Sequence, residues 1–278
     1  EVKISEDEIL PKYSSTEVYQ KQLPTTPPPQ ELTIEIGSPL DMPHLPGMKK
    51  IHLTITGGHD WRTWTRDNAQ QVQQVSSLRL KGTVSPLEIL HFLSSFKNLT
   101  SLRIENLTGK LCGKRFNVKS QTLSHDNLEY LGITHVEDNP CSSAYQFFKD
   151  GFEFPKLRRV EIVNLPIDPE NERYFLEFFK KIEHQLTQLD LQNVLVRVGS
   201  QAFANLEFKN LVSLHCEFRE PNSEGAKSVF RNLNRATPNL VEVSTNVVCT
   251  QGEKLAFDAN WSKINGSKRM ICDVHSSK

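Results

Sequence analysis

The amino-acid sequence predicts an α/β fold, a horseshoe-shaped solenoid whose parallel sheet lines the concave side and whose helices lie on the convex side. Three observations predict it. An apolar frame recurs along the chain at a nearly constant step, helical patterns lie between its recurrences, and a similar short junction leads into several of them. A single unit cannot bury its own apolar face, so the units should stack into one cooperative domain.

The recurring frame is an apolar residue followed by others three and five positions later, and its first positions lie 24 to 29 residues apart. This step is the period of repeats that contain one strand and one return segment. Shorter apolar runs at residues 32–36 and 270–274 predict atypical end strands. Eight units are recognisable, with frames Met48-Ile51-Leu53, Val75-Leu78-Leu80, Leu99-Leu102-Ile104, Leu128-Leu131-Ile133, Leu157-Val160-Ile162, Leu186-Leu189-Leu191, Leu211-Leu214-Cys216 and Leu240-Val243-Thr245.

The first thirty residues differ from the rest, since they hold five of the fifteen prolines and show no sustained apolar period. We expect residues 1–30 to be a disordered tail or linker. Residues 31–278 should form the repeat domain, with about eight recognisable units plus end units.

Three return segments carry helical patterns. Ser85-Pro86-Leu87-Glu88 is typical of a capping box with proline at the first helical position. Asp168-Pro169 and then Asn222 or Ser223 should begin two further helices. The apolar stripes that these three helices should turn toward the core are Ile89, Phe92, Leu93 and Phe96; Phe175, Phe178, Phe179 and Ile182; and Ala226, Val229, Phe230 and Leu233.

The junctions Phe96-Lys-Asn-Leu99, Phe208-Lys-Asn-Leu211 and Thr237-Pro-Asn-Leu240, together with the helical units, resemble intracellular leucine-rich repeats, most closely those of F-box proteins. The resemblance covers about residues 31 to 274. It implies a domain that holds a substrate for a cullin ubiquitin ligase, reached through an F-box module that lies outside this sequence. In this family an asparagine usually follows eight residues after the first leucine, but Asn106, Asn164 and Asn193 stand one residue earlier.

Composition limits the classes of partner. The 33 basic and 33 acidic residues leave no net charge, which argues against a nucleic-acid partner, and no apolar run is long enough to span a membrane. Five single cysteines favour a reducing compartment, so we expect the cytoplasm or the nucleus. Sequons at Asn98, Asn106, Asn260 and Asn265 favour the alternative of a secreted protein.

No catalytic, metal-binding or cofactor-binding motif is recognisable, so we expect neither an enzyme nor a cofactor. The Gly57-Gly58-His59-Asp60 segment is typical of a turn between strands. Cys216 occupies an inward frame position and should be a small core residue rather than a nucleophile.

A protein ligand on the concave face is therefore the predicted partner. Because side chains alternate along a strand, the residues between the frame positions should point outward. The first four strands would present four cations and one anion there, and the last four one cation and four anions. The candidate binding residues are Arg79, Lys81, Arg103, Tyr130, Arg159, Glu161, Gln188, Asp190, His215, Glu217 and Glu242.

A partner that fits this face should be acidic against Arg79, Lys81 and Arg103 and basic against Asp190, Glu217 and Glu242. Tyr130, with room beside Gly132, should be an aromatic anchor, and Tyr130 and Arg159 at the centre should supply most of the affinity. The leading function is thus a non-catalytic protein-interaction module, the substrate-recognition part of an F-box type ubiquitin ligase receptor. The alternatives are a secreted or cell-surface leucine-rich recognition protein and an RNA-handling adaptor.

Overall fold

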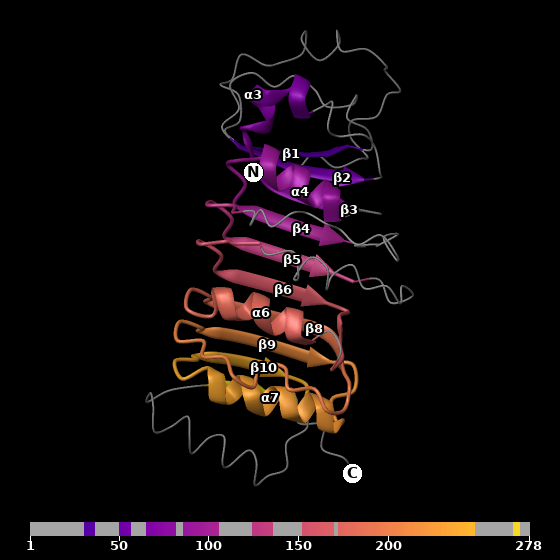
Figure 1. Ribbon diagram of the computed structural model, residues 1–278, viewed down its shortest axis with the longest axis vertical. Helices are drawn as coiled ribbons and strands as arrows, with labels where there is room; N and C mark the ends of the chain where they lie inside the picture. The colour runs from indigo at the N-terminus through magenta and orange to yellow at the C-terminus, as the bar shows by residue number, and fades with distance from the viewer. Residues whose placement is uncertain are drawn as a thin grey trace.

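The computed structural model describes residues 31–36, 50–56, 65–81, 86–105, 124–135, 152–169, 172–247 and 269–272 of the 278-residue chain (Figure 1). Several expectations from the sequence lie outside these residues, namely the tail at residues 1–30, the turn at residues 57–60 and the sequons at Asn106, Asn260 and Asn265.

The strands form one eleven-stranded parallel sheet, in which ten strands lie side by side in chain order and the short β7 pairs with β8 (Figure 1). The predicted α/β class, all eight frame strands and both end strands are confirmed. The strands are β1 (Glu31–Ile36), β2 (Lys50–Thr56), β3 (Val75–Lys81), β4 (Ser101–Glu105), β5 (Tyr130–Thr134), β6 (Arg159–Val163), β7 (Pro166–Ile167), β8 (Gln188–Val196), β9 (Ser213–Phe218), β10 (Glu242–Thr245) and β11 (Arg269–Cys272).

The strand register places the same frame position of successive units side by side. Leu102 of β4 pairs with Leu131 of β5, which pairs with Val160 of β6, and Leu189 of β8 continues the row. These side chains are at most 1% exposed. The second frame position forms a parallel buried row that includes Ile104, Ile133, Ile162, Leu191 and Cys216.

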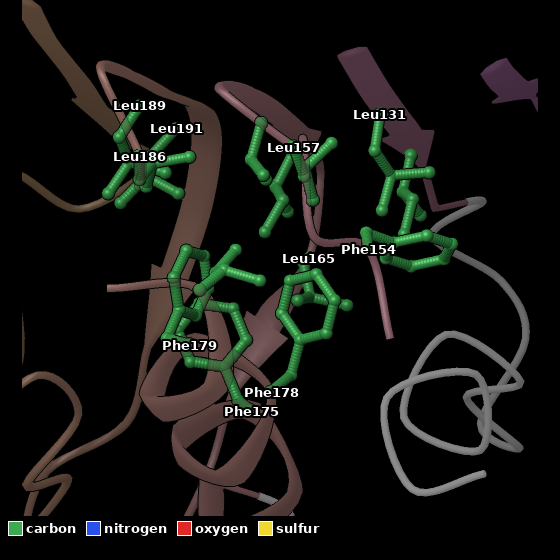
Figure 2. Packing of buried hydrophobic residues seen from close by; sticks show 14 of the residues in the cluster. Leu131, Phe154, Leu157, Leu165, Phe175, Phe178, Phe179, Leu186, Leu189 and Leu191 are labelled. Atoms are coloured by element: carbon green, nitrogen blue, oxygen red, sulfur yellow. The ribbon is translucent and has the colours of Figure 1, made fainter. Parts of the chain in front are cut away.

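The helices are α3 (Ala69–Val72), α4 (Pro86–Ser95), α6 (Glu172–Ile182) and α7 (Glu224–Ala236). The predicted apolar stripes of α4, α6 and α7 are buried, as expected. Figure 2 shows Phe175, Phe178 and Phe179 of α6 packed toward the leucines of the sheet. The hydroxyl of Ser223 accepts a hydrogen bond from the backbone amide of Ala226, so Ser223, rather than Asn222, caps α7.

The described part of helix α6 begins at Glu172, four residues after Asp168, where the sequence predicts the start of a helix. Just before it, β7 pairs with Leu195 and Val196 of β8, which keeps the chain extended through Ile167. The backbone amide of Glu172 then donates to the carbonyl of Asp168 at 2.9 Å. A bond between residues four apart is that of an α-helical turn, so Asp168 accepts the first helical bond, as expected of the residue that begins a helix.

The return from β8 to β9 contains turns and no helix over residues 197–212, so the strand-plus-helix pattern does not hold in every unit. Phenylalanines supply the apolar cover there instead. The ring centroid of Phe203 lies 5.1 Å from that of Phe175 and 5.3 Å from that of Phe179. Both Phe203 and Phe208 are fully buried, so this return closes the core without helical backbone.

Candidate binding surface

The residues predicted to point outward lie on one face of the sheet, which we call the polar face, and the first two of the three outward positions of each strand form two rows across it. The first row runs through Tyr130, Arg159, Gln188, Ser213 and Glu242. The second row runs through Arg79, Arg103, Gly132, Glu161, Asp190 and His215. The alternation of side chains along each strand therefore produces the face that the sequence predicts.

Exposure differs strongly among the eleven candidate residues. Arg79, Arg159, Gln188, Glu217 and Glu242 are exposed, whereas Glu161 is buried, at 5% exposed. The remaining five, which are Lys81, Arg103, Tyr130, Asp190 and His215, are half-buried. Glu161 thus lies on the polar face beneath other side chains, and it is placed to hold its neighbours rather than to meet a partner directly.

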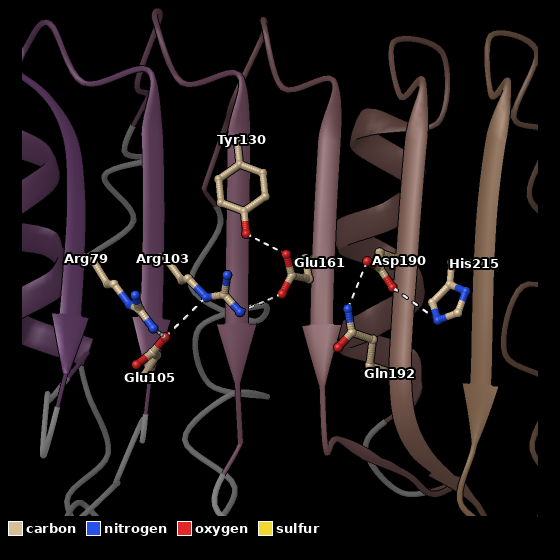
Figure 3. Close-up of polar contacts among 8 residues, drawn as sticks. All are labelled: Arg79, Arg103, Glu105, Tyr130, Glu161, Asp190, Gln192 and His215. Carbon is tan, nitrogen blue, oxygen red and sulfur yellow. Dashed lines mark hydrogen bonds and ion pairs between the residues drawn. The ribbon is translucent and has the colours of Figure 1, made fainter. Parts of the chain in front are cut away.

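Ion pairs cross the strands over the first half of the polar face (Figure 3). Glu105 Oε1 lies 2.6 Å from Arg79 Nη2 and 3.2 Å from Arg103 Nε. Arg103 Nη2 in turn lies 2.7 Å from Glu161 Oε1. Arg79 and Arg103, which the sequence assigned to an acidic partner, are therefore already paired with carboxylates of the same chain.

The Arg103–Glu161 pair joins β4 to β6 across β5, a distance of about 10 Å or two strand spacings. Gly132 stands between the two residues in the row and has no side chain to separate them. The Tyr130 hydroxyl also occupies this space, since a Cβ added to Gly132 would lie 2.6 Å from it. The room expected beside Gly132 is thus filled from within, by Tyr130 and Arg103.

Tyr130 points toward β6, and its hydroxyl donates to Glu161 Oε2 at 2.7 Å (Figure 3). The Arg159 guanidinium carbon lies 5.2 Å from the centroid of the Tyr130 ring. Burial of the phenol, together with its hydrogen bond to the Glu161 carboxylate, raises the pKa of Tyr130 well above its usual value. The ring is therefore neutral, anchored at its hydroxyl and stacked with a cation.

The second half of the face holds fewer internal contacts. Gln192 donates to Asp190 Oδ2 at 2.9 Å, and His215 Nε2 lies 4.0 Å from Asp190 Oδ1. Within the described part of the chain, neither Glu217 nor Glu242 forms an ion pair. The acidic character expected for this half is present as exposed carboxylates.

Two exposed valines at the entry to β9 and β10 were not recognised from the sequence. Val212 and Val241 are 42% and 54% exposed, and the amide of Val241 donates to the carbonyl of Val212 at 2.9 Å. They occupy the position directly after the first frame leucine, which is polar or charged in several other units. Comparing that position between units would have revealed the pair.

The asparagine before the first frame leucine bonds the backbone of the preceding unit. Asn98 Nδ2 donates to the carbonyl of Gln73 at 2.7 Å, and Asn239 Nδ2 donates to that of Lys209 at the same distance. Asn127 and Asn210 make the equivalent bonds. The recurring junction therefore satisfies carbonyl groups where neighbouring strands begin.

At the opposite strand ends, Asn164 and Asn193 have φ values of 61° and 50°, in the left-handed region that asparagine tolerates better than most residues. Asn193 Nδ2 donates to Asn164 Oδ1 at 2.7 Å. Two units later, Asn246 both donates to and accepts from the backbone of Phe218. Asn164 and Asn193, each seven residues after the first frame leucine of its unit, are thus joined side chain to side chain.

The remaining chemistry of the described residues offers few reactive groups. Cys216 is completely buried in the second frame row, and burial, with a smaller contribution from Asp190, raises the pKa of its thiol, which suits a packing role. In the described ranges, no three His, Cys, Asp or Glu side chains are grouped as a metal site would require. No helix within those ranges has the length and apolar character needed to traverse a bilayer.

Neither a protein-family model nor a curated protein matches this chain. The candidate binding surface is thus defined by its own geometry, in which two polar rows cross a parallel sheet and a tyrosine, an arginine and a buried glutamate meet at the centre.

Proposed function

We propose that this protein is a leucine-rich repeat solenoid that binds a protein ligand on the polar face of its sheet, which forms the concave side of a horseshoe. The observation that carries this proposal is the pair of polar rows, since they form a continuous surface with a fixed Tyr–Arg centre. Tyrosine and arginine dominate the energetics of many protein interfaces. A non-catalytic binding role accounts for this surface better than catalysis does.

Within this class, we propose the substrate-recognition part of an F-box type ubiquitin ligase receptor that acts in the cytoplasm or the nucleus. The repeated asparagine–leucine junctions support it, because each of four such asparagines bonds the preceding unit. Contact with the cullin ligase would be made by a module outside this sequence.

The alternative of a secreted recognition protein rests on the sequons, and the local structure gives one of them another explanation. Asn98 bonds the Gln73 carbonyl, as Asn127, Asn210 and Asn239 do in units without a sequon. Thr100 Oγ1 donates to the Ser76 carbonyl, as Thr187 Oγ1 does to that of Arg158. Both sequon residues thus have structural roles that recur elsewhere.

The alternative of an RNA-handling adaptor depends on the cations of the first half of the face, which are Arg79, Lys81 and Arg103. Arg79 and Arg103 both lie within ion-pair distance of Glu105, and Arg103 also pairs with Glu161, so their charges are largely balanced before any partner arrives. A phosphate backbone needs uncompensated cations, which makes this alternative the less favoured one.

The proposal is tested by placing a large side chain on the polar face, where it would block a ligand. Gln188 is exposed at the middle of the first row, and Val198, 78% exposed, lies off the sheet after β8. We expect Gln188→Trp to lose the proteins that wild type recovers by affinity purification, and Val198→Trp to retain them. Quantitative mass spectrometry of both, with cullin ligase subunits scored separately, gives the readout. Equal partner lists for the two variants would place recognition on another surface.

A further inference from the structure

The charges at the centre of the polar face do not balance. Three guanidinium groups, those of Arg79, Arg103 and Arg159, accompany two carboxylates, those of Glu105 and Glu161. One oxygen of Glu105 lies within ion-pair distance of both Arg79 and Arg103. Among these five groups, one guanidinium is therefore left without a carboxylate. Asp190, beside Glu161 in the second row, has contacts of its own, since it accepts from Gln192 and lies near His215.

Both oxygens of Glu161 are occupied, because Oε1 pairs with Arg103 at 2.7 Å and Oε2 accepts from the Tyr130 hydroxyl at 2.7 Å. Glu161 is also buried beneath these groups. It therefore offers no free oxygen to a further cation, and the surplus charge resides on Arg159.

Arg159 is exposed, and in the described part of the chain it forms no ion pair with a carboxylate. Its neighbours in the row are Tyr130 and Gln188, neither of which is charged. The guanidinium carbon lies over the tyrosine ring, 5.2 Å from its centroid. A cation–π contact does not require the N–H groups of the guanidinium as hydrogen-bond donors, so they can serve as a fork of donors to a partner.

The support beneath Arg159 is rigid. The Tyr130 hydroxyl is held by Glu161, and only a glycine at position 132 leaves space for it, since any Cβ there would lie 2.6 Å from the hydroxyl oxygen. A cation held on an immobile ring loses little conformational freedom when it binds. Preorganisation of this kind is what an anchor for a partner requires.

We propose that Arg159, stacked on Tyr130, is the anchor for one aspartate or glutamate side chain of an extended segment of the protein ligand. A single surplus charge matches a carboxylate, which carries one negative charge and accepts a bidentate fork from arginine. The nearby Glu161 and Asp190 carboxylates disfavour a dianion such as a phosphate. The acidic contact therefore lies at Arg159, and the paired Arg79 and Arg103 do not supply it.

This inference rests on the proposed function, and its test separates the two. A library of random twelve-residue peptides displayed on phage is selected on the full chain, and recovered peptides are synthesised for affinity measurements. Binding of each peptide to wild type, Arg159→Ala, Arg158→Ala and Gln188→Trp is then measured by calorimetry. Arg158 is the matched control, an exposed arginine one residue earlier that does not belong to the polar rows.

We expect peptides that are sensitive to Gln188→Trp to share one acidic residue. Their affinity should fall about tenfold or more with Arg159→Ala and less than about twofold with Arg158→Ala. Replacing the acidic residue of the peptide by its amide should lower the affinity for wild type by the same factor. It should leave the affinity for Arg159→Ala almost unchanged, because in that variant the carboxylate has already lost its partner. Circular dichroism melts of each variant confirm that the fold is retained.

Two results overturn the inference and leave the proposed function standing. In the first, peptides that are sensitive to Gln188→Trp lack an acidic residue. In the second, such peptides bind Arg159→Ala as tightly as they bind wild type. A selection in which no recovered peptide is sensitive to Gln188→Trp overturns both.

Discussion

The least expected side chain at the residue scale is Glu161, a carboxylate buried on a face that is otherwise polar and open. Leaving it without partners would cost several kcal/mol, on the order expected for an uncompensated buried charge. Arg103 and the Tyr130 hydroxyl remove that cost, and in return Glu161 fixes both of them. One buried acid thus determines how two of the candidate binding residues are presented.

Tyr130 makes the stability of the fold depend on pH in the alkaline range. Its pKa is raised in the folded protein, chiefly by burial, so the neutral phenol stabilises the fold fully below its unfolded value of about 10. This contribution is lost as the pH rises above that value. Above a pH of about 10, the free energy of unfolding of wild type should therefore fall more steeply than that of Tyr130→Phe, by up to about 1.4 kcal/mol per pH unit.

Guanidinium chloride titrations of wild type and Tyr130→Phe at a series of pH values measure this difference. Between pH of about 7 and 9 the difference between the two free energies of unfolding should stay constant, which serves as the internal control. Parallel curves that continue through the alkaline range would show that the phenol ionises equally easily in the folded and unfolded protein.

At the element scale, the close approach of helix α7 to β8 depends on one glycine. A Cβ added to Gly225 would lie 2.6 Å from the backbone carbonyl oxygen of Val196 and 3.1 Å from that of Arg197. Backbone atoms cannot move aside as the end of a long side chain can, so the first turn of α7 must shift if the residue is enlarged. Gly225 therefore sets the distance between this helix and the sheet.

Gly225→Ala should reverse the usual sign of a glycine-to-alanine change in a helix. Such a change ordinarily stabilises by about 0.5 to 1 kcal/mol, but here the contact with Val196 should make it destabilise by about 1 to 3 kcal/mol. Ser228→Ala, in the same helix, should change stability by less than about 0.5 kcal/mol. Urea melts of both variants provide the comparison, and a Gly225→Ala variant as stable as wild type would refute the close contact.

At the scale of the whole molecule, the sheet is a linear array in which each strand stabilises its neighbours. The middle strands β5, β6 and β8 are paired along both edges, whereas β1 and β11 each pair along one edge in the described part of the chain. Local opening in such an array begins at its ends, because an end strand breaks fewer contacts when it separates.

Hydrogen exchange should therefore slow from the ends of the sheet toward its middle. Peptides that cover β1 or β11 should exchange their backbone amides faster than peptides that cover β6, when both are followed by mass spectrometry under native conditions. Exchange at the same rate in all of them would mean that the sheet opens in a single step or that its ends are covered.

The ten strands that lie side by side, their order and the direction of their side chains follow from the sequence alone. A frame of apolar residues three and five positions after the first fixes which side chains of a strand are buried, because alternation is a local property of an extended backbone. Units of similar length then place equal frame positions side by side, as Leu102, Leu131 and Val160 illustrate. The polar face followed from the same reasoning.

How the charges on that face are combined depends on tertiary contacts. Arg103 and Glu161 are 58 residues apart and belong to strands that are not adjacent, so no pattern of neighbouring units predicts their contact. It forms because Gly132 leaves a gap between them. The absent helix before β9 has a similar origin, since its place is taken by Phe203 packing on Phe175 from a different segment of the chain. Contacts of this kind depend on the space left between side chains, which exists only once the strands are assembled.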